Sequence, residues 1–123
     1  MRLPLLATLL LLTGTNILHA NVTGQNLEEY CAPLNSQNST DPTEPMKSGM
    51  CFGYIQAAIE GLVSLQNEKQ TDETLKFCIP EGVKLRQNVE VVWRFIASHP
   101  EALHKPAFSI IWAAEVTAFP CSK

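Results

Sequence analysis

The stretch from Met46 to Glu68, MKSGMCFGYIQAAIEGLVSLQNE, carries the strongest signal for the fold of this chain. Its large apolar side chains recur at helical spacing, at Ile55, Ile59, Leu62 and Val63. The residues that fall on the opposite side are polar, namely Gln56, Glu60 and Ser64. A period near 3.6 residues predicts a long amphipathic helix that buries one side against the rest of the protein.

A stripe of small residues runs along the same helix. Gly53, Ala57 and Gly61 recur at four-residue spacing. A glycine inside a helix costs about 1 kcal/mol relative to alanine, so another interaction should compensate for the two glycines. We expect a second helix to approach this stripe closely, and a ligand groove is the alternative interpretation.

Three further segments have helical patterns, residues 24–32, 84–98 and 106–119. Each is followed by a proline, which cannot continue a helix and disfavours helical geometry in the residue before it. No segment alternates between apolar and polar residues with the period of two that is typical of a strand. The sequence therefore predicts an all-α fold, a small bundle of about four helices.

The two C-terminal helices differ in how much of their surface is apolar. In residues 84–98, Glu90 and Arg94 are spaced for a surface ion pair. Val89, Val92, Trp93 and Ile96 recur at helical spacing in this segment, and Val91 and Phe95 widen its apolar face. Residues 106–119 contain only three polar side chains before Pro120, those of Ser109, Glu115 and Thr117. The last helix is therefore expected to be central or to lie at an interface.

The first twenty residues have the pattern of a secretory signal peptide. Arg2 precedes an apolar run from Leu3 to Leu12, and Ala20 offers a small residue before a cut. The run is shorter than the roughly 20 residues that a membrane-spanning helix needs. We expect residues 1–20 to be removed and residues 21–123 to form one exported domain without a membrane span.

The charge balance of the chain bears on its partners. The chain has nine Lys and Arg residues against twelve Asp and Glu residues, and its basic residues form no cluster. Proteins that bind nucleic acid usually carry a basic patch that neutralises phosphates. We therefore expect no nucleic-acid partner.

Four cysteines fall within the expected domain, Cys31, Cys51, Cys78 and Cys121. An even number of cysteines in an exported chain predicts two disulfides, and their spacing does not match that of zinc ligands. In an up-down bundle the first two helices meet at one end, and the last two meet at the cysteine-bearing ends. This favours Cys31 with Cys51 and Cys78 with Cys121. The alternative pairs Cys51 with Cys78 and Cys31 with Cys121.

Residues that could carry catalysis are sparse. The chain has no Gly-rich phosphate loop, nucleophile elbow or metal-binding helix pair. The carboxylates of Glu81, Glu101 and Glu115 occur singly, with nothing to mark a raised pKa or paired acid–base work. His99 and His104 lie in a short connection, either as a titrating or interface pair or as a helix-end and a loop histidine. We expect a protein that is not an enzyme and has no metal or cofactor.

Four ordered motifs connect the sequence to a known family. They are Cys51-Phe-Gly-Tyr-Ile-Gln, Phe77-Cys-Ile-Pro-Glu-Gly-Val, His99-Pro-Glu-Ala-Leu-His-Lys-Pro-Ala and Ala118-Phe-Pro-Cys121. Together they resemble the Rap/Tai family, exported immunity proteins associated with type VI secretion in Gram-negative bacteria. Three residues depart from the family pattern, Lys84, Trp112 and Glu115, and we expect them at surfaces that set the choice of partner.

The resemblance implies a non-catalytic helical protein of the periplasm that binds a toxin from a neighbouring cell and blocks it. Characterised members neutralise peptidoglycan-cleaving amidases by covering or plugging the active-site cleft, and some act as dimers. The partners implied are therefore a cognate effector and, as an option, a second copy of the chain. A rigid, disulfide-stapled scaffold suits this role because it limits the entropy lost on binding.

We expect the effector to contact the connection between the last two helices, since a loop on a rigid hairpin can enter a cleft. This connection contains Ser98, His99, Pro100, Glu101 and His104. The expected anchors at an adjoining or dimer interface are Phe95, Phe108 and Trp112.

Two other functions stay open at this point. A periplasmic helical chaperone of the acid-stress type would lose its packing or its dimer at low pH and bind many clients. A secreted lipid carrier would use a groove at Gly53, Ala57 and Gly61 and would carry extractable lipid.

Overall fold

The computed structural model describes residues 21–36, 39–68 and 72–121, so the predicted signal peptide, residues 1–20, lies outside the described residues. The described part is helical and contains no strand, which confirms the all-α prediction. The elements in chain order are α1 (Gly24–Cys31), η1 (Ala32–Asn35), α2 (Glu44–Gln66), η2 (Glu73–Leu75), α3 (Leu85–Ser98), η3 (Pro100–Ala102) and α4 (Ala107–Ala118). The helix labels α refer to α-helices and the labels η to short 3-10 turns.

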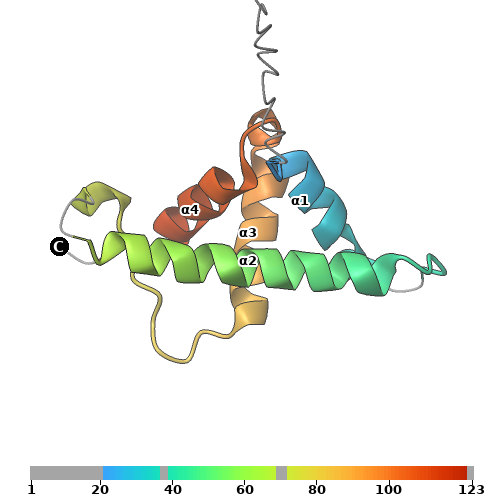
Figure 1. Cartoon of the computed structure of the whole chain (residues 1–123), viewed down its shortest axis with the longest axis horizontal. Coiled ribbons are helices and arrows are strands. Elements are labelled where there is room, and N and C mark those ends of the chain that lie inside the picture. The colour runs from blue at the N-terminus through green and yellow to red at the C-terminus, as the bar shows by residue number, and fades with distance from the viewer. Residues whose placement is uncertain (1–20, 37–38, 69–71, 122–123) are drawn as a thin grey trace, which may run out of the picture.

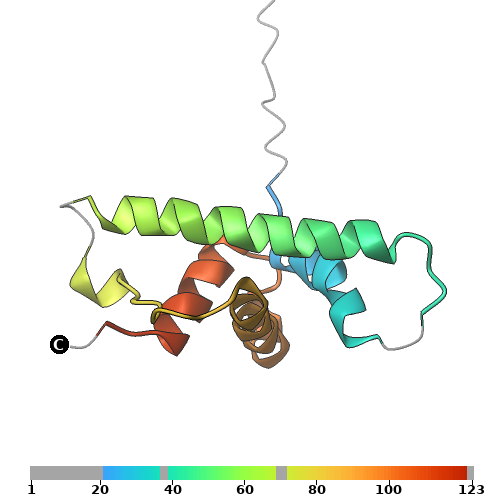
Figure 2. The same cartoon turned by 90° about the horizontal axis from the view of Figure 1, so that it is seen from below.

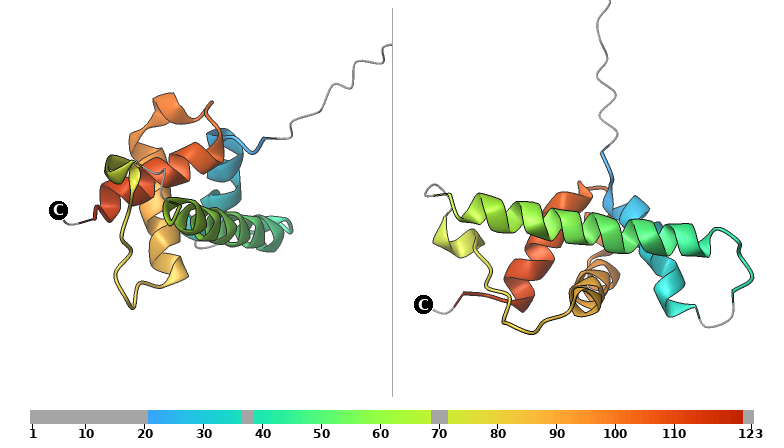
Figure 3. Two further views of the ribbon diagram at one scale, coloured as in Figure 1. Left: turned by 60° about the vertical axis from the view of Figure 1, so that its left-hand side comes forward. Right: turned by 60° about the horizontal axis from the view of Figure 1, so that its bottom comes forward.

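The long helix α2 organises the other three. Figure 1 shows α2 lying across the molecule, with α3 running crosswise to it between α1 and α4. In Figure 2 the three shorter helices lie on the same side of α2, and the two views of Figure 3 agree with this arrangement. The domain is therefore one long helix laid over a group of three, rather than four parallel helices.

The core lies between α2 and this group. On α2 the predicted positions Ile55, Ile59 and Leu62 are buried, whereas Val63 is 37% exposed, so the prediction was wrong for Val63. The other helices contribute Leu27, Val89, Val92, Ile96, Ala107, Ile110, Ile111 and Ala114. Burying one side chain of Val, Leu or Ile contributes about 1.5–3 kcal/mol, so this cluster supplies the main driving force for folding.

Both disulfides form in the preferred pairing. Cys31 at the end of α1 is bonded to Cys51 in α2, and Cys78 is bonded to Cys121 beyond α4. The first bridge is fully buried within the core, whereas Cys78 of the second is exposed. The bridges hold α1 against α2 and close the α3–α4 pair at its open end.

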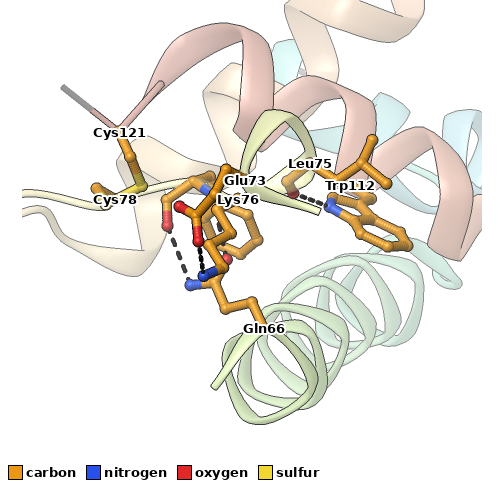
Figure 4. The surroundings of a disulfide bond; sticks show 8 residues. Gln66, Glu73, Leu75, Lys76, Cys78, Trp112 and Cys121 are labelled. Atoms are coloured by element: carbon orange, nitrogen blue, oxygen red, sulfur yellow. Dashed lines mark hydrogen bonds and ion pairs between the residues drawn. A yellow bond between two sulfur atoms is a disulfide. The ribbon is translucent and has the colours of Figure 1, made fainter. Parts of the chain in front are cut away.

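The segment that joins α2 to α3 is held at several points near the second disulfide (Figure 4). The Gln66 side chain donates to the Phe77 carbonyl oxygen at 3.0 Å and accepts from the Phe77 amide at 3.1 Å. The Trp112 indole Nε1 donates to the carbonyl oxygen of Leu75 at 2.7 Å. Next to the bridge, the Cys78 amide donates to the Phe119 carbonyl oxygen at 2.8 Å. This connection is therefore fixed to both α2 and α4.

The small-residue stripe of α2 does not have the expected partner along its length. A Cβ atom added at Gly53 would meet nothing within 4 Å, and both Gly53 and Ala57 are exposed. At Gly61 the nearest atom would be Cε2 of Phe108, at 4.0 Å. The expected close approach of a helix is thus wrong at Gly53, and α4 reaches the stripe only through the Phe108 ring.

Close backbone approach occurs instead at Gly24, the first residue of α1. Its amide donates to the Lys105 carbonyl oxygen at 2.9 Å, and the Gln25 amide donates to the Leu103 carbonyl oxygen at 2.9 Å. A Cβ atom at Gly24 would lie 2.8 Å from both Cα and O of Leu103. Only glycine therefore fits where the start of α1 rests on the α3–α4 connection.

Candidate functional site

The predicted contact residues begin where α3 ends. The Ser98 hydroxyl lies 2.9 Å from the Arg94 carbonyl oxygen and 3.1 Å from that of Phe95. The His99 ring stacks on the Phe95 ring with centroids 4.0 Å apart and an interplanar angle of 17°. Packing and backbone contacts thus hold Ser98 and His99 in one conformation at the end of the helix.

The contacts of His99 also fix which ring nitrogen carries the proton in the neutral imidazole. Its Nδ1 lies 2.8 Å from the Phe95 carbonyl oxygen. A carbonyl oxygen only accepts hydrogen bonds, so Nδ1 must be the donor. In the neutral ring Nε2 is then an acceptor, and it has no partner among the described residues. Nε2 is therefore available to a donor from another molecule.

Phe95, Ser98 and His99 line one groove between α3 and α4. The groove has a volume of about 290 Å³, and its other lining residues are Val91, Arg94, Ala114, Thr117 and Ala118. Arg94 supplies its only charged side chain, and the Arg94 Nε donates to the Glu90 carboxylate at 2.8 Å, which confirms the predicted ion pair. The groove is thus mainly apolar with a polar end formed by Ser98, His99 and Arg94.

The other predicted contact residues lie beyond this groove. Pro100, Glu101 and His104 are exposed, and the side chains of Glu101 and His104 make no hydrogen bond or ion pair within the described ranges. The backbone that carries them is held by the contacts of α1 with residues 103–105. The connection therefore presents free polar side chains on a fixed backbone.

The predicted anchors do not form one patch. Phe95 lies in the α3–α4 groove, while Phe108 lines a second groove of about 240 Å³ with Tyr54, Ala57 and Ala58 of α2. Trp112 lines a third groove of about 370 Å³ whose other residues are Leu75, Ser109, Ala113, Val116 and Thr117. Because the Trp112 indole donates a hydrogen bond to the Leu75 carbonyl oxygen, Trp112 also stabilises the fold by holding η2 against α4.

No cofactor or metal position stands out in this geometry. Among residues 21–36, 39–68 and 72–121, no group of three or more His, Cys, Asp and Glu side chains is placed to hold a metal ion. All four cysteines are oxidised in disulfides. What the arrangement offers chemically is a set of rigid surfaces that can bind another molecule.

Rigid binding surfaces occur in many classes of protein, so the chain was compared with models of known protein families. The model of the Rap1a immunity proteins matches residues 23–121, which include all four α-helices and both disulfides. The chain belongs to the Rap1a immunity protein family. No curated protein and no solved structure matches the chain. Family membership supports an immunity role, in which the protein binds a toxin partner.

The residues that depart from the family pattern have three different environments in this Rap1a immunity protein. Lys84 precedes α3 and makes no side-chain capping hydrogen bond. Trp112 is half-buried and bonded to Leu75. Glu115 is fully buried, so the expectation that it lies at a partner-facing surface was wrong.

The expectation of an unremarkable carboxyl was also wrong for Glu115. Burial raises the pKa of this carboxyl from 4.5 to about 7. The signal that could have found it is the spacing of Ala107, Ile111 and Glu115, since residues four apart share a helix face. Ala107 and Ile111 are buried, and Glu115, on the same face of α4, is buried with them.

The described helices also bear on the predicted absence of a membrane span. None of them combines the length and the apolar character that crossing a bilayer requires.

Proposed function

We propose that this Rap1a immunity protein is exported to the periplasm, where it binds and blocks a cell-wall-degrading effector such as a peptidoglycan amidase. The observation that carries the proposal is the family match over residues 23–121. The two disulfides support export, because such bonds persist in oxidising compartments. The effector would be delivered by type VI secretion from a neighbouring cell, and inhibition would require binding alone.

The contact we propose is the α3–α4 connection together with the groove beside it. The exposed side chains of Glu101 and His104 stand on a backbone that α1 holds in place. Phe95 and His99 are stacked before any partner arrives. Little loop entropy, and little side-chain entropy at Phe95 and His99, would be lost on binding, and preorganisation of this kind favours tight complexes.

The chemistry of the groove supports a partner segment of mixed character. An apolar side chain of the effector would pack on Phe95, Val91 and Ala114. The Arg94 side chain, 78% exposed, would face an acidic group, and Nε2 of His99 would accept a hydrogen bond. Buried hydrogen bonds surrounded by apolar contacts are typical of the few residues that dominate binding energy.

A homodimer is the second association that we propose for this family member. Phe108 and Trp112, four residues apart on α4, line two grooves that do not include His99, although Thr117 lines both the Trp112 groove and the His99 groove. They would act as its anchors, which leaves the α3–α4 connection free for the effector. Sedimentation of the purified protein reports this state, and a monomer at all concentrations would contradict it.

The double substitution His99→Ala with Glu101→Ala tests the proposed contact. We expect the affinity for the effector to fall at least about 30-fold, because hot-spot residues contribute 2 kcal/mol or more. The measurement is calorimetry or interferometry with a purified peptidoglycan amidase effector.

The control for this experiment is a double variant at the other end of α3, Glu81→Ala with Arg86→Ala. Both side chains are exposed and make no hydrogen bond or ion pair within the described ranges. We expect this variant to bind as the wild type does. If the His99 and Glu101 variant folds and keeps its full affinity, the proposed contact is wrong. If the wild-type protein itself fails to bind the amidase, the proposed effector class is wrong.

A further inference from the structure

One titratable group in the core has no role in the proposed contact. The Glu115 side chain in α4 is 0% exposed, and neither of its carboxyl oxygens has a hydrogen-bond partner among the described residues. Within the part of the chain that the structure describes, Asn88 of α3 is the other buried polar residue, and its Oδ1 is also unpaired. A buried polar group without a partner costs free energy, and the cost is far larger when the group is charged.

The elements that pack on α4 bring no compensating charge to Glu115. The main contacts of α4 are with α1, α2 and α3, and η2 reaches it through Leu75. Their charged or titratable side chains are Glu28, Glu29 and Tyr30 of α1, Glu44, Lys47, Tyr54 and Glu60 of α2, Glu73 of η2, and Arg86, Glu90 and Arg94 of α3. Every one of them is at least partly exposed, so none is buried with Glu115. Burial is the sole cause of the raised pKa of Glu115.

The sign of the effect on stability follows from proton linkage. The unfolded chain releases the Glu115 proton near pH 4.5, whereas the folded domain holds it up to about pH 7 because burial raises the pKa. The stability that this proton contributes is therefore complete below the unfolded pKa. It is lost as the pH rises through the folded pKa.

We propose that Glu115 makes the packing of α4 a pH-sensitive element, so that mild acid tightens the domain and a rise through neutral pH loosens α4. The helix stays attached at both ends when it loosens. The Ala107 amide donates to the Val22 carbonyl oxygen at 2.8 Å, and the Cys78–Cys121 bridge closes the other end. Ionisation of Glu115 would thus act on the grooves that α4 lines without releasing the helix.

This behaviour has the opposite sign to that of an acid-activated chaperone, which loosens at low pH. Two aspartates, Asp41 and Asp72, have the opposite effect on the pH dependence of stability, and this effect arises only in stronger acid. Hydrogen bonds from the backbone and side chain of Thr43 lower the pKa of Asp41, and those of Thr74 lower the pKa of Asp72. Their stabilising effect is lost as the pH falls through these lowered values, below the window of Glu115.

The test is urea unfolding of the full domain between about pH 5 and about pH 8, the window that the Glu115 carboxyl sets. We expect the unfolding equilibrium constant of the wild type to rise by about two orders of magnitude across this range. In Glu115→Gln, and in Glu115→Met as a second variant without a polar group, we expect this dependence to vanish. The exposed Glu81→Gln serves as the control and should keep the wild-type dependence.

Amide hydrogen exchange places the effect within the domain. After correction for the intrinsic pH dependence of exchange, protection of the α4 amides should fall with rising pH in the wild type and stay constant in Glu115→Gln. The proposal would be overturned if the stability of the wild type and that of the two Glu115 variants showed the same dependence on pH. A loss of α4 protection that persists in Glu115→Gln would also overturn it.

Discussion

Replacing Cys31 and Cys51 together with alanine is expected to lower the free energy of unfolding by about 3–5 kcal/mol. Two terms add to this loss. The bridge spans a sequence separation of 20, so removing it frees the unfolded chain. Both sulfur atoms also belong to fully buried residues, so alanine leaves space in the core. The free energy of unfolding of a small domain is about 5–15 kcal/mol. Such a loss is a large part of this value, so the variant should be partly unfolded at about 37 °C.

The matched experiment removes the other bridge, with alanine at Cys78 and Cys121. Its sequence separation is 43, which gives a larger loop term, but Cys78 is exposed and leaves no comparable space. Chain entropy then predicts a loss of about 4 kcal/mol for this pair. Urea unfolding of both variants measures the two losses. A loss below about 1 kcal/mol in the first pair would contradict its role in the core.

Substituting Gly24 with alanine is the second change with a large expected effect. The added Cβ would lie 2.5 Å from Cδ1 of Ile110 and 2.8 Å from Cα and O of Leu103. The Leu103 backbone cannot move away without breaking its hydrogen bond from the Gln25 amide. Overpacking of this kind costs about 1–3 kcal/mol, and we expect a value at the upper end because backbone must shift. Thermal or urea unfolding measures it.

Gly53→Ala is the matched control, since it is the same substitution at an exposed position within a helix. The added methyl group meets nothing within 4 Å. Alanine has the higher helix propensity, so this variant should be more stable than the wild type by about 0.5–1 kcal/mol. Equal effects at Gly24 and Gly53 would show that propensity, and not the close approach of Leu103, decides the outcome.

The helices and the disulfides of this domain could be predicted because they depend on local pattern and element order. The period of Ile55, Ile59 and Leu62 locates α2, and the prolines after each of the other helices locate their ends. The preferred cysteine pairing needed only the order of the helices and the ends that meet. The pairing did not need the crossing angles of the helices, and α3 in fact runs crosswise to α2 and not alongside it (Figure 1).

The parts that could not be predicted depend on contacts between distant segments. Nothing local marks Gly24 as the point where α1 meets Leu103, because its neighbour lies far along the chain. The stripe at Gly53 had a reasonable local interpretation, yet no element covers it in the described part of the chain.

In the candidate site too, local features could be predicted from the sequence, whereas features that depend on distant segments could not. His99 stacks on Phe95 four residues earlier, a spacing that brings side chains together near the end of a helix, here with His99 just past the last residue of α3. The separation of Phe95 from Phe108 and Trp112 depends on where α2 and η2 lie beside α4. The orientation of Glu115 was readable from its spacing to Ile111, but the apolar composition of α4 allowed either an inward or an outward glutamate.

The two disulfides also determine how the domain carries mechanical load. A force applied across residues 31–121 passes through the sulfur atoms and bypasses the chain between Cys31 and Cys51 and between Cys78 and Cys121. All of α3 and α4, with the proposed contact, lies inside the second bypassed segment. Only the chain from Cys51 to Cys78, which contains most of α2, can be extended. The binding surface is thus mechanically isolated from a pull on the domain until the Cys78–Cys121 bridge is reduced.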